Sequence, residues 1–104
     1  MREATPMDVT PQQTAQALGA GTQIVDVREA DELGDGVIPG ARHIPLGELR
    51  SRLGELDPAV PVIAVCRSGR RSGAAADQLA AAGFSADTMA GGMLAWQAAG
   101  LPTA

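Results

Sequence analysis

Short apolar runs alternate with polar, helix-prone stretches along most of the chain. The apolar runs are strand-sized, and the stretches between them carry helix formers and helix-capping residues. Strands that alternate with helices over one short chain favour parallel pairing, because each connection crosses over the sheet. The pattern therefore predicts an α/β fold, a three-layer sandwich with a central, mainly parallel sheet. The expected strands are residues 7–9, 23–27, 62–65 and 83–89.

The third of these runs, Val62–Val65, is rich in β-branched residues and follows two prolines. A continuous apolar block of this length is typical of a strand buried on both faces. The chain then passes Cys66 and a short basic loop, and Ser72 is expected to cap a helix that continues through 74–82 and stops at Gly83. This order, strand, tight loop and helix, places Cys66 in front of a helix amino terminus.

Other helical segments are expected on either side of this unit. Thr10 and Gln13 form a capping box for a helix that ends near Gly19. Leucines at helical spacing predict a further helix over 46–53. Shorter helical stretches are expected over 30–33 and 93–99, and Trp96 in the last of them is interpreted as a core anchor.

Charged residues follow the second strand at the sheet edge where parallel folds place their sites. Asp26 is a candidate to orient a loop near Cys66, and the alternative is a structural pair such as Arg28 with Glu32. His43, the only histidine, is interpreted as a structural residue rather than a general base. The Gly91-Gly92 pair is expected to form a turn that approaches the Cys66 loop.

Composition narrows the classes of function. The 104 residues suffice for one domain, 1–104, and 45% hydrophobic with 19% charged residues are values of a globular chain. A net charge of -4 argues against nucleic acid as a partner. One cysteine excludes an internal disulfide, and with one histidine it makes a zinc site improbable, so neither metal nor cofactor is expected. No apolar run is long enough to span a membrane, and the polar segment Met1–Thr10 has no signal-peptide pattern. A cytoplasmic location is therefore expected.

Cys66 carries the candidate chemistry. A thiolate is the reactive form of cysteine, and both a helix amino terminus and nearby cations lower the pKa of a thiol. Three arginines follow within five residues, and Gly69 lets the backbone turn so that its N-H groups point to a common centre. The loop thus predicts an anion-binding site with a nucleophile at its base. An inert, buried structural cysteine is the alternative.

The segment Cys66–Ser72 after an apolar strand resembles the active-site loop of single-domain rhodaneses, which carry sulfur as a cysteine persulfide. Val37 departs from that family, which often has histidine there in a structural role. The resemblance spans about residues 7–102 in register. Its further motifs are Ile24–Glu29, Ile38–Ala41, His43–Pro45, Gly91-Gly92 and Trp96.

The resemblance implies a sulfurtransferase that moves sulfur from a small anionic donor such as thiosulfate, through a Cys66 persulfide, to a thiol or cyanide acceptor. The catalytic residue is then Cys66, and the substrate-binding residues are Arg67, Ser68, Gly69, Arg70 and Arg71. Which arginine faces the substrate stays open at this point. Two alternatives remain: a non-catalytic rhodanese-like binding module, and a cysteine phosphatase or arsenate reductase. Those phosphatases have arginine six positions after the cysteine, where this chain has Ser72.

Overall fold

The computed structural model describes residues 5–104; the first part of the polar amino-terminal segment, residues 1–4, lies outside the described residues. A five-stranded sheet runs through the centre with the strand order β1-β5-β4-β2-β3, and each pair of neighbours is parallel. The strands are β1 (Asp8–Val9), β2 (Gln23–Asp26), β3 (Arg42–His43), β4 (Val62–Val65) and β5 (Ala86–Met89).

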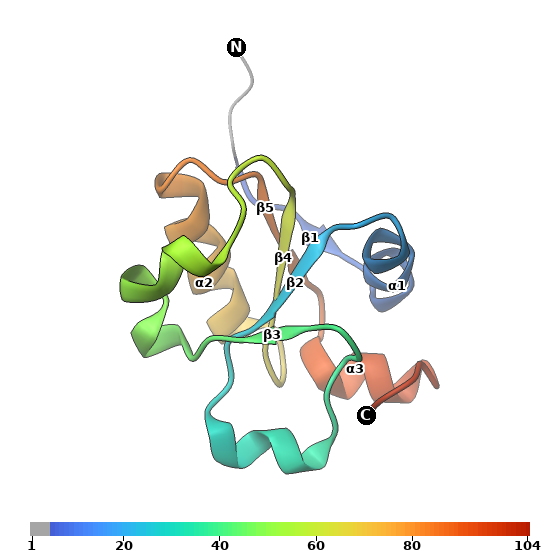
Figure 1. Ribbon diagram of the computed structural model, residues 1–104. Helices are drawn as coiled ribbons and strands as arrows, with labels where there is room; N and C mark the ends of the chain where they lie inside the picture. Colours follow the sequence, from blue (N-terminus) through green and yellow to red (C-terminus); the bar gives the residue numbers. More distant parts are fainter. Residues whose placement is uncertain (1–4) are drawn as a thin grey trace.

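Helices cover both faces of this sheet (Figure 1). The α-helices are α1 (Pro11–Gly19), α2 (Arg70–Ala81) and α3 (Gly92–Ala98), and three 3-10 helices are η1 (Ala30–Asp35), η2 (Leu46–Glu48) and η3 (Arg50–Glu55). In Figure 1, α2 lies on one side of the strands, whereas α1 and α3 lie on the other. The expected three-layer α/β sandwich with a parallel sheet is therefore confirmed.

Alternate residues of the central strands supply two separate cores. On the α2 side, Val25, Val62 and Ala64 pack with Leu79 of α2 and Leu49 between η2 and η3. On the other side, a second cluster joins the sheet to α3 and α1, with Ile24, Ile63, Val65, Met93 and Trp96 among its buried members. All four residues of β4 are buried, as expected for a strand covered on both faces. Trp96 is 2% exposed, which confirms it as a core residue.

The segment 46–53 differs from the single helix that its leucine spacing predicts. It forms the short helices η2 and η3, and Arg52 has non-helical dihedrals (φ -119°, ψ 15°). Glycines at 47 and 54 explain part of the difference, because glycine lowers the stability of a helix interior. The last strand is also shorter than expected, since Gly83 belongs to the turn after α2 and residues 84–85 precede β5 without regular structure.

Every helix within residues 5–104 is too short or too polar to cross a membrane.

Candidate functional site

Cys66 lies at the junction between β4 and α2, where the carboxyl end of the central strand meets a helix amino terminus. The helix begins at Arg70, earlier than predicted, and its cap is Gly69 with φ 104°. The expectation that Ser72 caps the helix is therefore wrong. Glycine adopts this left-handed conformation without steric cost, so the chain turns into the helix at Gly69 and Ser72 falls within the first turn.

The sulfur of Cys66 is enclosed by backbone and hydroxyl donors. Gly69 N-H donates a hydrogen bond to Sγ over 3.0 Å, and Ser72 Oγ lies 3.4 Å from Sγ. Cys66 is only 1% exposed, and this burial raises the pKa of its thiol. The Ser72 hydroxyl and the backbone N-H groups of Ser72, Gly69 and Ser68 together lower the pKa more, so the net pKa lies below the ordinary value. The site favours a thiolate.

A second hydroxyl supports this arrangement. Thr88 of β5 lies 2.7 Å from Ser72 Oγ, and Ser72 also donates to the carbonyl of Gly69. Ser72 and Thr88 are both buried. Sequence reasoning did not select Thr88, because it stands 16 residues after Ser72 in a segment that indicated only a strand. The parallel pairing of β4 with β5 brings the two side chains together.

The turn before α3 packs directly against the Cys66 loop, as the Gly91-Gly92 pair predicted. Met93 N-H donates to the carbonyl of Cys66 over 2.8 Å, and Leu94 N-H donates to that of Arg67 over 3.1 Å. A Cβ on Gly92 would lie 2.4 Å from the Cys66 carbonyl oxygen, and its φ is 59°. A side chain at this position is therefore excluded twice, by contact and by conformation.

The predicted substrate-binding residues have different surroundings. Arg67, Ser68 and Arg70 are exposed beside the loop, and Gly69 is half-buried. Arg71 forms a bidentate ion pair with Glu32 of η1, with Nη1–Oε1 and Nη2–Oε2 distances of 2.6 and 2.8 Å. Sequence reasoning missed this partner, which stands 39 residues earlier.

Two charged residues at the end of β2, Asp26 and Arg28, form a buried ion pair. The Arg28 side chain binds the carboxylate of Asp26, with an Nη2–Oδ2 distance of 2.7 Å, and both side chains are at most 3% exposed. Arg28 contacts Glu32 only through the backbone carbonyl of Glu32, so Arg28 does form a structural pair, but with Asp26 and not with Glu32 as in the example drawn from the sequence. His43 Nε2 lies 2.7 Å from the carbonyl oxygen of Arg28, as suits a structural histidine.

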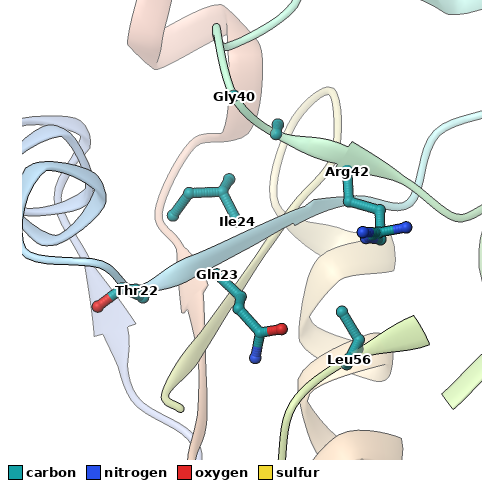
Figure 2. Close-up of a pocket in the computed structure, with 7 residues that line it drawn as sticks. Thr22, Gln23, Ile24, Gly40, Arg42 and Leu56 are labelled. Atoms are coloured by element: carbon teal, nitrogen blue, oxygen red, sulfur yellow. The ribbon is translucent and has the colours of Figure 1, made fainter. Parts of the chain in front are cut away.

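A cavity of about 500 Å³ opens beside the amino end of β2 (Figure 2). It is lined by Thr22, Gln23 and Ile24 at the start of β2 and by Gly40–Arg42 and Leu56. Because the strands are parallel, the amino end of β2 lies at the opposite edge of the sheet from Cys66. The candidate site at Cys66 therefore rests on the environment of its thiol and not on this cavity. Within residues 5–104, no group of three or more His, Cys, Asp or Glu side chains is placed to hold a metal ion.

Several known proteins are similar to this chain. The thiosulfate sulfurtransferase GlpE of Ectopseudomonas mendocina is 33% identical over 86% of this chain and 84% of its own. The putative sulfurtransferase YtwF of Bacillus subtilis is 38% identical over 71% of this chain and 72% of its own. Among solved structures, a rhodanese-related protein from Thermoplasma volcanium superposes with a TM-score of 0.88 at 28% identity, covering 94% of this chain and 97% of that one.

Residues 10–99 also match the family of rhodanese-like domains. This range includes the whole of the Cys66 loop, the η1 segment and the α3 turn that packs on the loop. The chain therefore belongs to the rhodanese-like family.

Proposed function

We propose that this protein is a sulfurtransferase of the rhodanese type, in which Cys66 carries sulfur as a persulfide. The observation that carries the proposal is the environment of the sulfur, which is held by Gly69 N-H at 3.0 Å in front of α2 and has a lowered thiol pKa. Relatives named sulfurtransferase, at 33% and 38% identity, support the reaction class. The proposal includes the prediction that residues 1–104 form one rhodanese-like domain.

The first half-reaction loads sulfur onto the enzyme. The Cys66 thiolate attacks the outer sulfur of a donor such as thiosulfate, an S–S bond forms, and the donor S–S bond breaks so that sulfite leaves with the electron pair. The resulting persulfide carries a negative charge on its outer sulfur. Backbone N-H groups at the start of a helix stabilise such a charge without proton transfer.

The second half-reaction releases the sulfur. A cyanide ion or a thiolate attacks the outer sulfur of the persulfide, and the Cys66 thiolate leaves, which gives thiocyanate or a new persulfide on the acceptor. The lowered pKa of the Cys66 thiol, which increases the ionised fraction available for attack, also makes the Cys66 thiolate a better leaving group. Because donor and acceptor react in turn at one sulfur, the kinetics are of the ping-pong type.

Arginine side chains around the loop provide positive charge for an anionic donor. Arg67 and Arg70 are exposed at the loop surface, whereas Arg71 is partly buried and its charge is held by Glu32. The pKa of Arg71 is raised first by its hydrogen bond to Glu32 and then by the charges of Glu32 and of the Cys66 thiolate. Burial of the side chain offsets part of this rise. This coupling to the thiolate supports Arg71 as the cation that the donor meets next to the sulfur.

The spacing of the loop argues against phosphatase or arsenate chemistry. A phosphatase of this kind binds phosphate through an arginine six positions after the cysteine, and that position is the buried Ser72 here. A solved structure from Rhodopseudomonas palustris that is described as a possible tyrosine phosphatase is nevertheless 25% identical, with a TM-score of 0.84 and coverage of 97% of this chain and 86% of its own. This likeness makes a direct comparison of the two activities necessary.

A paired assay tests the proposal. Sulfur transfer from thiosulfate to cyanide and to a thiol is measured beside hydrolysis of a phosphate ester, with the same preparation and the Cys66→Ser variant as control. The proposal predicts transfer that depends on Cys66 and no matching hydrolysis. Phosphate hydrolysis as fast as thiosulfate consumption would favour the phosphatase, and the absence of both activities would favour a binding module.

A further inference from the structure

The amino terminus of α2 has an unusual charge pattern. Arg70 and Arg71 occupy its first turn, which has no acidic residue, and its cap Gly69 offers no side chain as a hydrogen-bond acceptor. Cations at a helix amino terminus are unfavourable because the helix dipole is positive there. Ser72 in this first turn and the cap Gly69 also supply N-H groups that lower the pKa of Cys66. A contact that stabilises this turn must therefore come from another element of the fold.

Glu32 of η1 is the anchor that the structure supplies. Its two carboxylate oxygens accept hydrogen bonds from Nη1 and Nη2 of Arg71 at 2.6 and 2.8 Å. The two side chains are 23% and 35% exposed, so the pair is partly withdrawn from water. Two parallel charge-assisted hydrogen bonds fix the orientation of a guanidinium as well as its distance.

Glu32 is itself held at two points. Its Oε1 accepts a hydrogen bond from Glu29 N-H over 3.0 Å, and its backbone carbonyl accepts one from Arg28 Nη1 over 3.2 Å. Arg28 is fixed in turn by the buried ion pair with Asp26 at the end of β2. A continuous set of hydrogen bonds thus connects the sheet, through Arg28 and Glu32, to Arg71 in α2.

We propose that Glu32 is a positioning residue for Cys66: through Arg71 it fixes the first turn of α2, and with it the N-H groups and the Ser72 hydroxyl around the sulfur. Glu32 does not touch the sulfur or the substrate. Its importance for sulfur transfer rests on the proposed function, but the position of the N-H groups is measurable on the free thiol, without any sulfur donor.

A purely electrostatic role of Glu32 predicts the opposite change in the pKa of Cys66 when Glu32 is replaced. If Glu32 acted only as a negative charge, its removal would stabilise the thiolate and lower the pKa of Cys66. If it acts as an anchor, its removal loosens the donors and raises that pKa.

The charged groups on the elements around Cys66 are Arg67, Arg70 and Arg71 on the loop and α2, Asp77 further along α2, Arg28, Glu29, Asp31, Glu32 and Asp35 on and before η1, Asp26 on β2 and Asp87 on β5.

The test measures the rate at which iodoacetamide alkylates Cys66 as a function of pH. The proposal predicts that Glu32→Gln slows alkylation at pH 7 by about threefold or more, with rates that converge at high pH, because a smaller fraction of the thiol is ionised. The matched control is Asp31→Asn, which removes a carboxylate from the exposed part of the same helix η1. This control should leave the rate at pH 7 unchanged or slightly faster.

A second variant separates position from charge. The double variant Glu32→Gln/Arg71→Gln has the net charge of the wild type but also lacks the Arg71 cation, which acts on the Cys66 thiolate. The lost anchor is therefore measured in this variant as faster hydrogen exchange of residues 69–73, not as a slower alkylation rate. Hydrogen exchange of residues 69–73 should be faster in Glu32→Gln, while that of β4 is unchanged. If Glu32→Gln does not fold, Glu32→Asp, which keeps the charge but has a shorter reach, should show the same changes to a smaller extent.

An equal or faster rate at pH 7 in Glu32→Gln, with unchanged exchange at residues 69–73 in both variants, would overturn the proposal. None of these measurements uses a sulfur donor. A protein that lacks sulfurtransferase activity would therefore still give a clear answer on Glu32, and a failed anchor would leave the proposed function standing.

Discussion

The Ser72 hydroxyl oxygen lies 3.4 Å from the Cys66 sulfur. When Cys66 is a thiol, its S-H donates to this oxygen; when Cys66 is a thiolate, the Ser72 O-H can turn to donate to the sulfur. Thr88, 2.7 Å from the same oxygen, can then supply a hydrogen bond to Ser72. Two buried hydroxyls thus adjust to either charge state of the nucleophile without movement of the backbone.

Replacing Ser72 should make Cys66 less acidic. A hydrogen bond to a charged group contributes about 1.5–3 kcal/mol, so Ser72→Ala is expected to slow alkylation at pH 7 by about tenfold. Thr88→Val should act in the same direction but less, because Thr88 acts through Ser72. Ser85→Ala, at an exposed position before β5, is the control and should leave the rate unchanged. An unchanged pH profile in Ser72→Ala would show that the hydroxyl does not stabilise the thiolate.

The contact between Gly92 and the Cys66 carbonyl predicts a strong effect of one methyl group. Gly92→Ala is expected to destabilise the fold by about 2 kcal/mol or more, because the backbone must move and the positive φ is unfavourable for alanine. The control Gly73→Ala lies within α2 with no atom within 4 Å of the added carbon, and it should stabilise the protein by up to about 1 kcal/mol. Thermal unfolding measures both; equal melting temperatures would contradict the close packing of α3 on the loop.

The Glu32–Arg71 pair predicts how stability depends on pH. The hydrogen bond from Arg71, with smaller contributions from the Glu29 N-H and nearby arginine charges, lowers the pKa of Glu32 from 4.5 to about 2. A carboxylate with a lowered folded-state pKa stabilises the fold fully above pH 4.5, and this contribution is lost as the pH falls from 4.5 towards 2. The free energy of unfolding of the wild type should therefore exceed that of Glu32→Gln by about 1 kcal/mol at pH 6, because the pair is partly exposed to water. This difference in free energy should shrink below pH 4.5. Urea unfolding at several pH values checks this; a difference independent of pH would contradict it.

The three loop arginines should contribute unequally to donor binding. Arg71→Ala is expected to raise the KM for thiosulfate by about tenfold or more, as for the loss of a charge-assisted hydrogen bond, whereas Arg67→Ala and Arg70→Ala at exposed positions should change it by less than about threefold. Arg71→Lys keeps the charge but loses the bidentate geometry, and should be intermediate. Three small and equal effects would mean that no loop arginine binds the donor directly.

The sequence predicted the features that depend on local pattern. The apolar run 62–65 indicated a buried strand, and the structure confirms it with four buried residues. The Gly91-Gly92 pair indicated a turn close to the loop, and Gly92 proves to be in contact with Cys66. Strand β3 was missed, because two polar residues, Arg42 and His43, give no strand-like pattern on their own.

Contacts between residues that are far apart in the chain could not be predicted from the sequence. Spacing of four residues suggested that Arg28 pairs with Glu32, but the end of β2 turns Arg28 back onto Asp26, two residues away. Glu32 is then free to bind Arg71, and with a sequence separation of 39 residues the pattern of the chain gives no sign of this contact. Likewise Thr88 approaches Ser72 only because β5 pairs with β4.

A persulfide on Cys66 is the central claim of this account, and intact-protein mass spectrometry after treatment with thiosulfate tests it most directly. Cys66 is the only cysteine of the chain, so no second thiol can release the sulfur as an internal disulfide. The account predicts a mass gain of one sulfur atom that disappears when cyanide or a thiol is added and that is absent in Cys66→Ser. A wild-type mass that stays unchanged in excess donor, with the thiol still open to titration, would contradict the claim.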